Sequence, residues 1–349
     1  MFDNKYWQLI MSPFSLLYKW VMQFRNHLYN IEYKAIFQFE TTVISVGNLS
    51  VGGTGKTPMV EYIIRFLLKN KLENKITTLS RGYGRNTKGF RMANEQDDAN
   101  TLGDEPFQIY RKFRPAINVA VGEDRVLAIP SILYEQPENE VIILDDAFQH
   151  RSVKPNLSIV LSDYQHLFYK DYVLPSGRLR ESRSGVSRAD ALVITKCPDN
   201  LSAEEMGNIR ESASIYMRDK PIYFSGISYG NCYSPYMERP VKEKIAVVTG
   251  IAHPEPLLEF LKSKYKICKH FRFQDHHYLS SNEIQEIALF AQENQVDVLT
   301  TEKDWVKLIN HSNFEASLKN HLFYVPMMVQ FLDEEKSFQQ LIEETLKEH

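Results

Sequence analysis

A glycine-rich segment that ends in Lys56 and Thr57 carries the clearest chemistry in this sequence. The segment, GNLSVGGTGKT at 47–57, lies between a β-branched run and the helical pattern MVEYIIRFLLK. Glycines let consecutive backbone N–H groups surround phosphate oxygens, while a lysine reaches the β- and γ-phosphates and a threonine hydroxyl binds Mg²⁺. Ser50 occupies the position of the first glycine in the general pattern, but the order of strand, loop and helix still predicts an ATP site. The predicted nucleotide ligands are Gly52, Gly53, Thr54, Gly55, Lys56 and Thr57.

Two aspartates supply the acidic partner that a phosphate loop needs. Asp145 and Asp146 follow the apolar run VIIL at 141–144. A carboxylate at the end of a buried strand beside the loop can bind Mg²⁺ or its water shell. We therefore predict a magnesium site formed by Thr57, Asp145 and Asp146, without ranking the two aspartates. An acidic turn after an ordinary buried strand is the structural alternative.

Two arginine-containing loops are candidates for binding further phosphate groups. LPSGRLRE at 174–181 contributes Arg178 and Arg180, and SRGYGR at 80–85 combines two arginines with glycines that open the backbone. Arginine suits phosphate because its charged group is planar and donates several hydrogen bonds. We expect Arg178 and Arg180 to bind nucleotide phosphate or a phosphate of the acceptor. The alternative is that these are solvated basic loops.

Asp104, in GDEP at 103–106, is the candidate general base. A carboxylate there could accept the proton of an attacking hydroxyl, although an aspartate at a helix start is commonly a cap. Further along, QDHH at 274–277 and TEKD at 301–304 add polar groups. No third metal ligand is evident near the adjacent Asp and His, so acid–base assistance is favoured over metal binding.

Short apolar strands must position these groups. Runs such as TTVISV at 41–46, VIIL at 141–144 and ALVIT at 191–195 are apolar throughout, which predicts a parallel sheet covered by helices on both faces. A second series of the same kind begins with KIAVVT at 244–249. We therefore predict an α/β protein with a phosphate-loop domain at 36–220, a linker at 221–243 and a smaller α/β domain at 244–349.

The N-terminal segment, 1–35, predicts an amphipathic helix. Ser12 and Pro13 resemble a helix cap and first turn, and an apolar stripe follows at Phe14, Leu17, Val21 and Phe24. Polar interruptions make the segment too short for a membrane span. Two interpretations stay open: a helix lying in the membrane interface, or a helix packed on the protein's own core.

The composition excludes several classes of protein. Of 349 residues, 43% are hydrophobic and 24% are charged, which is ordinary for a globular protein. The net charge of −3 gives no support for nucleic-acid binding. Cys197, Cys232 and Cys268 are widely spaced, which argues against a disulfide framework and favours the cytoplasm.

Seven segments in register resemble the tetraacyldisaccharide 4'-kinase family. They are GNLSVGGTGKTP, SRGYGR, GDEP, DDAFQHR, LPSGRLRE, QDHH and TEKD, spread between about 41 and 305. The resemblance implies transfer of the ATP γ-phosphate to the 4'-hydroxyl of tetraacyldisaccharide 1-phosphate, a step of lipid A biosynthesis. It also implies a peripheral enzyme at the cytoplasmic face of the bacterial inner membrane, with no obligate protein partner.

The resemblance further implies a fold and a set of catalytic residues. Two α/β/α domains, the larger of the P-loop type, would be joined by a short β linker, with the active site between them. Lys56 would take the phosphate-loop role in catalysis. Asp104 would be the base, paired across the domains with His276.

Two other functions remain alternatives. A GTPase or metallochaperone switch has apparent support in Thr195-Lys196-Cys197-Pro198-Asp199, although its aspartate is one residue too far along for a guanine-binding motif. A membrane-bound nucleotide sensor without catalysis would have no use for Asp104 or His276.

Overall fold

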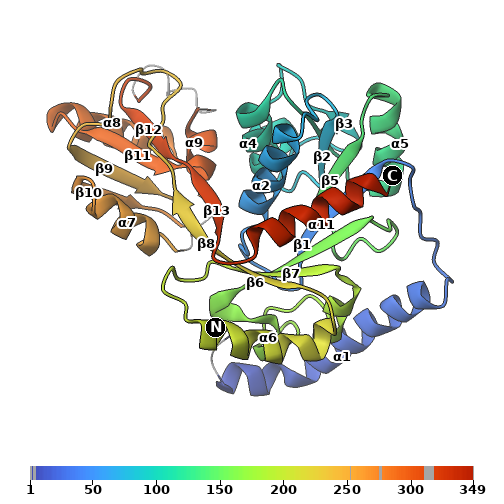
Figure 1. Ribbon diagram of the computed structural model, residues 1–349. Helices are drawn as coiled ribbons and strands as arrows, with labels where there is room; N and C mark the ends of the chain where they lie inside the picture. Colours follow the sequence, from blue (N-terminus) through green and yellow to red (C-terminus); the bar gives the residue numbers. More distant parts are fainter. Residues whose placement is uncertain (1, 3–4, 252, 275–276, 310–317, 349) are drawn as a thin grey trace.

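Two β-sheets organise the computed structural model, which describes residues 2, 5–251, 253–274, 277–309 and 318–348. Among these residues, one sheet has nine strands and the other has four. Figure 1 shows them as two lobes, with the smaller sheet at the upper left. The arrangement confirms the predicted α/β class.

The larger sheet is parallel at its centre and antiparallel at both edges. In sheet order its strands are β13 (Met327–Phe331), β8 (Ile222–Tyr229), β7 (Ala191–Thr195), β6 (Leu157–Asp163), β1 (Thr42–Asn48), β5 (Val141–Asp145), β2 (Ile76–Ser80), β4 (Asn118–Val121) and β3 (Arg91–Met92). Only the edge pairs β13·β8 and β4·β3 are antiparallel among the strands described. The central strands are buried along their whole length, which explains why their sequences do not alternate.

Helices cover both faces of this sheet. One face carries α2 (Lys56–Lys69), α4 (Asp104–Phe113) and α11 (Glu335–Lys347), and the other carries α5 (Arg125–Glu135) and α6 (Ala203–Met217). Ile44 and Val46 of β1 face the first set, whereas Val43 faces the second. Short helical turns in the connections are α3 (Ala99–Leu102), η1 (Tyr164–His166), η2 (Phe168–Lys170) and η3 (Arg183–Arg188).

The smaller lobe repeats this layering. Its parallel strands lie in the order β10 (Lys266–Arg272), β9 (Lys244–Thr249), β11 (Asp297–Thr301) and β12 (Leu322–Val325). Helices α8 (Ser281–Glu293) and α9 (Glu302–Ile309) pack on one face and α7 (Glu255–Lys262) packs on the other. The cluster beneath α8 and α9 also contains Leu102 and Phe107 of the larger lobe, so the two lobes share apolar contacts.

Two strands connect the lobes. β8 extends the larger sheet, and the returning β13 pairs antiparallel with it from Met327 opposite Tyr229 to Phe331 opposite Ser225. After β13, α11 buries Phe338 and Ile342 in the core of the larger lobe. Residues 327–347, which the sequence analysis placed in the smaller domain, therefore pack on the larger sheet, because that is where their apolar side chains are buried. The other domain limits stay predictions.

The N-terminal helix α1 (Lys5–Asn30) begins earlier than the sequence pattern suggested. The interpretation of Ser12 and Pro13 as its first residues is wrong, because Pro13 lies inside the helix. Proline has no N–H for the carbonyl four residues before it, here that of Leu9. The Ser12 hydroxyl donates to this Leu9 carbonyl over 2.8 Å, so the proline leaves no unpaired acceptor there.

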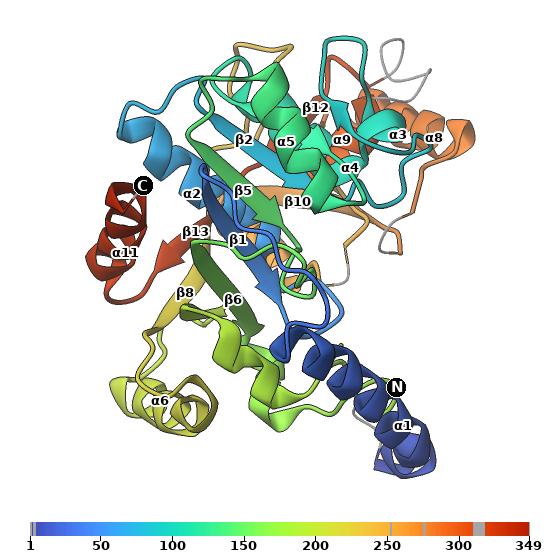
Figure 2. The same ribbon diagram turned by 90° about the vertical axis from the view of Figure 1, so that its right-hand side faces the viewer.

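The apolar face of α1 is exposed. Large side chains on it include Leu9, Ile10, Phe14, Leu17, Trp20, Val21 and Phe24. The opposite face packs on the larger lobe, where Trp7 Nε1 donates to the Pro175 carbonyl over 3.1 Å. Figures 1 and 2 both show α1 at the base of this lobe, away from the smaller one. The apolar stripe is thus not used for packing on the protein's own core.

Candidate nucleotide and phosphoacceptor site

The phosphate loop and the two predicted aspartates meet at the carboxyl ends of the parallel strands. Val46 of β1 is the register partner of Asp145 at the end of β5, which puts the aspartates beside the start of the phosphate loop. β7, further along the sheet, ends at Thr195, which also contacts this loop. Ligands of open α/β sheets bind at this edge.

The phosphate loop is held by a hydrogen bond to the end of β1 at Thr54 and has free space beside its glycines. Gly55 has φ +85°, a backbone conformation that favours glycine, and precedes Lys56 and Thr57 at the start of α2. Thr54 is buried, and its hydroxyl accepts a hydrogen bond from Asn48 Nδ2 over 2.9 Å. A Cβ added to Gly52 or Gly53 would have no described atom within 4 Å apart from those of its neighbours in the chain. This geometry leaves room for phosphate groups above the loop.

Asp145 and Asp146 have different surroundings. Asp145 is 3% exposed, and no described residue donates a hydrogen bond to its Oδ1. Burial and, after it, the charge of Glu105 raise the pKa of Asp145 to about 7, although Lys56 opposes both effects. A buried carboxylate without a full set of donors is costly alone and fits a divalent cation beside nucleotide phosphates.

Asp146 pairs with cationic side chains instead. Lys56 Nζ lies 3.7 Å from its Oδ1, and Arg180 donates to Oδ1 and Oδ2 over 3.1 and 3.2 Å. Its φ of +52° turns the chain sharply after β5. The two neighbouring aspartates therefore present one buried carboxylate and one carboxylate held by positive charge.

The arginine loop lies against the phosphate loop. Arg180 N donates to the Leu49 carbonyl over 2.7 Å, and Ser50 forms an isolated bridge with Leu179. Ser50, the departure from the general glycine pattern, thus sits where the two loops join. Arg180 reaches Asp146, whereas Arg178 pairs with Asp171 at 3.7 Å and lies over the Phe2 ring. The structure therefore brings Arg180, rather than Arg178, to the aspartates.

The segment that favoured a GTPase has another role in the fold. Thr195 Oγ1 donates to the Thr54 carbonyl over 2.8 Å, and Lys196 Nζ donates to the Gly53 carbonyl. Lys196 also pairs with Asp163 at 2.7 Å. These contacts support the phosphate loop from the neighbouring strands.

Asp104 is the first residue of α4, and Gly103 occupies the cap position without a side-chain hydrogen bond. Asp104 therefore does not act as the cap that the structural alternative expected. Tyr278 of the smaller lobe donates its hydroxyl hydrogen to Asp104 Oδ1 over 3.3 Å. Burial and the Asp104 carboxylate raise the pKa of Tyr278. His276, the predicted partner of Asp104, lies outside the described residues.

Three residues at the site received no role in the sequence analysis. Glu105 acts electrostatically on Asp145, and Tyr278 contacts Asp104. Arg125 is 3% exposed at the start of α5, and burial lowers its pKa to about 10 while Asp145 opposes this shift. Glu105 lies within GDEP and Tyr278 follows QDHH, so both could have been found from those motifs, whereas nothing around Arg125 marks it in the sequence.

Asp304 and Glu302 of the TEKD segment, 301–304, make contacts that hold the fold together. Asp304 is buried and accepts hydrogen bonds from Gly250 N and Thr301 Oγ1, each over 2.8 Å. Glu302 pairs with Lys112 of the larger lobe. These contacts stabilise the smaller lobe and its junction with the larger one.

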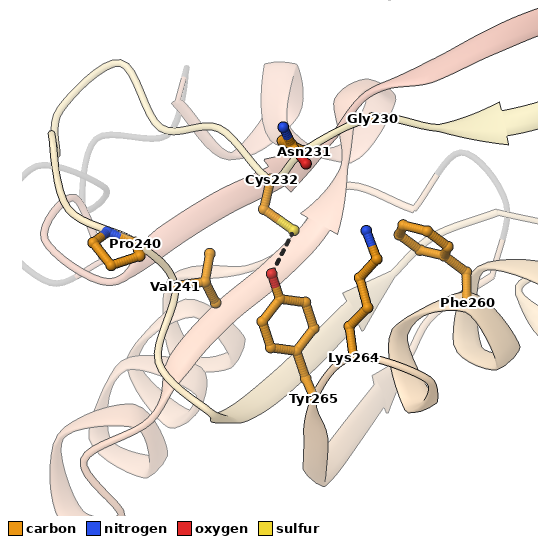
Figure 3. A pocket seen from close by; sticks show the side chains of 8 residues that line it. All are labelled: Gly230, Asn231, Cys232, Pro240, Val241, Phe260, Lys264 and Tyr265. Atoms are coloured by element: carbon orange, nitrogen blue, oxygen red, sulfur yellow. Dashed lines mark hydrogen bonds between the residues drawn. The ribbon is translucent and has the colours of Figure 1, made fainter.

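The smaller lobe contains a pocket of about 290 Å³ (Figure 3). Cys232, Lys264 and Tyr265 line it, and the Tyr265 hydroxyl donates to Cys232 Sγ over 3.6 Å. Burial raises the pKa of the Cys232 thiol, which keeps it protonated. None of the predicted site residues within the described part of the chain lines this pocket.

The described part of the chain contains neither a membrane-spanning helix nor a cluster of metal ligands. No described helix has the length and hydropathy needed to cross a bilayer. The described residues contain no group of three or more His, Cys, Asp or Glu side chains arranged to hold a metal. Magnesium bound with a nucleotide needs only one or two carboxylates, because phosphates and water supply the other ligands.

Comparisons with known proteins identify the family of this chain. The family model described as tetraacyldisaccharide-1-P 4'-kinase matches residues 7–347. The tetraacyldisaccharide 4'-kinase of Flavobacterium johnsoniae is 40% identical over 97% of this chain and 97% of its own. That of Flavobacterium psychrophilum is 42% identical over 95% and 94%.

A solved structure extends the likeness to three dimensions. The crystal structure of LpxK from Aquifex aeolicus in complex with ATP aligns with a TM-score of 0.76 and 30% identity. The alignment covers 97% of this chain and 99% of that one. From its sequence and its fold alike, this chain belongs to the tetraacyldisaccharide-1-P 4'-kinase family.

Proposed function

We propose that this chain transfers the γ-phosphate of ATP to the 4'-hydroxyl of tetraacyldisaccharide 1-phosphate, a step of lipid A biosynthesis. Its relatives carry the name of that kinase, and a related structure holds ATP. One observation carries the proposal to this chain: the phosphate loop places Lys56 3.7 Å from Asp146 and beside the buried Asp145. That combination suits phosphoryl transfer, in which catalysis depends mainly on positioning and charge.

Each predicted ligand has a role in this proposal. The phosphate loop binds the nucleotide through Gly52, Gly53, Thr54, Gly55, Lys56 and Thr57. Arg180 adds positive charge at the same place, and Arg178 is a further candidate for phosphate. Thr57, Asp145 and Asp146 would hold Mg²⁺, which when bound neutralises charge on the β- and γ-phosphate oxygens.

Asp104 is the proposed general base. It would accept the proton of the 4'-hydroxyl as the hydroxyl oxygen attacks the γ-phosphorus and ADP departs. The Tyr278 hydrogen bond supports this role, because it ties Asp104 of the larger lobe to the smaller lobe. Pairing with His276 would strengthen Asp104 as a proton acceptor and make catalysis depend on closure of the lobes.

We also propose that α1 rests on the membrane. Its exposed apolar side chains, including Phe14, Leu17 and Trp20, form a surface suited to the boundary between lipid headgroups and acyl chains. A substrate with four acyl chains would be presented at that boundary. The proposed location is peripheral, at the cytoplasmic face of the bacterial inner membrane.

The test is phosphorylation of the purified lipid. The protein in detergent is given ATP and Mg²⁺, with and without tetraacyldisaccharide 1-phosphate, and the lipid is followed by mass. We expect one phosphate to be added only when ATP, metal and protein are all present. Hydrolysis that ignores the lipid would favour a GTPase-like switch, and no turnover at all would favour a nucleotide sensor.

A further inference from the structure

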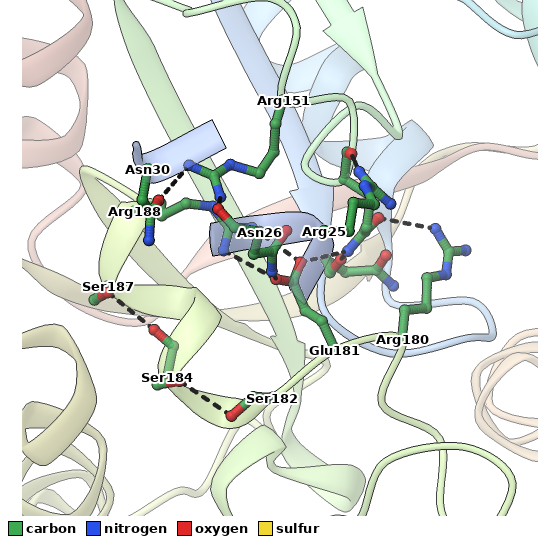
Figure 4. A network of polar contacts seen from close by, with 12 residues as sticks. Arg25, Asn26, Asn30, Arg151, Arg180, Glu181, Ser182, Ser184, Ser187 and Arg188 are labelled. Atoms are coloured by element: carbon green, nitrogen blue, oxygen red, sulfur yellow. Dashed lines mark hydrogen bonds and ion pairs between the residues drawn. The ribbon is translucent and has the colours of Figure 1, made fainter. Parts of the chain in front are cut away.

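The face of α1 that packs on the larger lobe leads by hydrogen bonds toward the nucleotide site (Figure 4). Asn26 Nδ2 donates to Glu181 Oε2 over 2.9 Å, and Arg25 donates to the Gln149 carbonyl. Tyr18 donates its hydroxyl hydrogen to the Arg180 carbonyl over 3.1 Å. Side chains on one face of α1 thus contact Glu181, Gln149 and Arg180, and the last of these pairs with Asp146.

Glu181 is the centre of this network. It is 1% exposed, and Arg188 donates to its two carboxylate oxygens over 2.9 Å each. Gln149 Nε2 donates to its Oε1 over 3.4 Å, in addition to the bond from Asn26. A Cβ on Gly185 would lie 2.6 Å from Glu181 Oε2, so only glycine permits this close approach. A buried carboxylate with so many donors holds its neighbours in one arrangement.

Gln149 carries the network into the phosphate loop. Its Nε2 also donates to the Asn48 carbonyl over 2.8 Å, and its Oε1 accepts a hydrogen bond from Arg180 over 3.3 Å. Asn48 in turn holds Thr54 of the loop, and Arg180 holds Asp146. One amide therefore connects Glu181 to both sides of the nucleotide site.

We propose that Asn26 and Glu181 are positioning residues for MgATP, and that they couple the seating of α1 to the orientation of Gln149 and Arg180. This inference rests on the proposed function, because it takes Arg180 and Asp146 as residues of the nucleotide site. The N-terminal helix then does more than present an apolar face: its polar face forms part of the scaffold of the site. Loosening that face weakens MgATP binding without any change in the groups that touch the nucleotide.

The test is the Kd for MgATP of the full chain in detergent, measured with a fluorescent nucleotide and without any lipid acceptor. Asn26→Ala removes one donor to the buried Glu181 carboxylate, and we expect about fivefold weaker binding. Glu181→Gln keeps the shape but removes the charge opposite Arg188, and we expect about tenfold weaker binding. In the phosphoryl transfer assay, the KM for ATP should rise while the KM for the lipid stays unchanged.

Asn30→Ala is the matched control. Asn30 lies one turn further along α1, and its side-chain oxygen accepts a hydrogen bond from Arg151 over 2.8 Å without reaching Glu181. We expect its MgATP Kd to remain within about twofold of the wild-type value. Thermal unfolding shows which variants fold, and Asn26→Ala carries the test if Glu181→Gln does not fold.

The outcomes separate the inference from the function on which it rests. Failure of the wild-type chain to bind MgATP would overturn the proposed function itself. Normal binding by the wild type and by both variants would overturn only the positioning role. An equal loss in Asn26→Ala and Asn30→Ala would also overturn it, because general loosening of α1 would then explain both.

Discussion

Lys112 is the residue whose replacement should cost the most stability at the junction of the lobes. On α4, it pairs with Glu61 of α2 over 2.6 Å and with Glu302 of α9. The side chains of Glu61 and Glu302 are 1% and 8% exposed, and that of Lys112 is 15% exposed. Removing Lys112 leaves two nearly buried carboxylates close together. Breaking a buried ion pair in this way costs about 3–5 kcal/mol, which we expect for Lys112→Met at pH 8.

The stability lost in Lys112→Met should depend on pH, in a direction that the pKa of Glu302 predicts. Burial and, after it, the charge of Glu61 raise the pKa of Glu302, and Lys112 opposes both. The folded state therefore holds the Glu302 proton more tightly than the unfolded state does. The contribution of Glu302 to stability is most favourable at low pH and is lost as pH rises through its raised pKa. Without Lys112 this loss grows, so the variant should be less impaired at pH 5 than at pH 8.

Urea unfolding at both pH values measures the effect. Lys75→Met is the control, because Lys75 pairs with Glu140 at the surface, and its loss should lie within the error of the measurement. Adding Glu302→Gln to Lys112→Met should restore part of the stability, because it removes one unpaired charge. A loss at pH 8 no larger than that of the control, or one that is equal at pH 5, would refute the reasoning.

Three further predictions concern the site and the helix. Asp104→Ala should lower kcat by about 10²–10⁴-fold while the Kd for MgATP stays unchanged, since a general base acts on the acceptor; a small loss of turnover would exclude this role. Asp145→Asn should stabilise the metal-free protein at pH 8 but not at pH 4, because burial raises the Asp145 pKa from 3.8 to about 7 and ionisation then opposes folding. A shift of three pKa units sets an upper limit of about 4 kcal/mol on that gain. Thermal unfolding in the presence of a chelator measures it, and an equal difference in stability between variant and wild type at both pH values would contradict the prediction. Replacing Phe14 and Trp20 together by serine should weaken binding to anionic vesicles by at least about tenfold, since burying each such side chain contributes about 1.5–3 kcal/mol. Flotation of the protein with vesicles measures this binding, and an unchanged result would refute the proposal that α1 contacts the membrane.

Local signals in the sequence were sufficient to predict that the phosphate loop lies beside the aspartates. The phosphate loop at 47–57 and the aspartates after β5 depend on a strand, a turn and a helix in fixed order, and that order is written in consecutive residues. Parallel strands then bring their carboxyl ends to one edge, so the meeting of Lys56 with the aspartates could be expected. The apolar face of the N-terminal helix could also be predicted from neighbouring residues. The start of this helix was misplaced, because the Ser12 hydroxyl replaces the hydrogen bond that Pro13 cannot donate.

Contacts between distant segments could not be predicted in this way. Which aspartate pairs with Lys56 depends on the turn at Asp146, and the approach of Tyr278 to Asp104 depends on how the lobes pack. The packing of α11 on the larger sheet could not be predicted from its sequence. An amphipathic pattern shows that one face of a helix is buried, but it does not show which element covers that face.

The kind of chemistry could therefore be predicted from the residues alone, since phosphate and metal binding need particular residues at short, fixed spacings. Which buried charges compensate one another, as at Glu181 and Lys112, depends on the folded chain. Those pairings join residues that lie far apart in the chain. They are selected by the free energy of burying charge, which depends on every group that surrounds it.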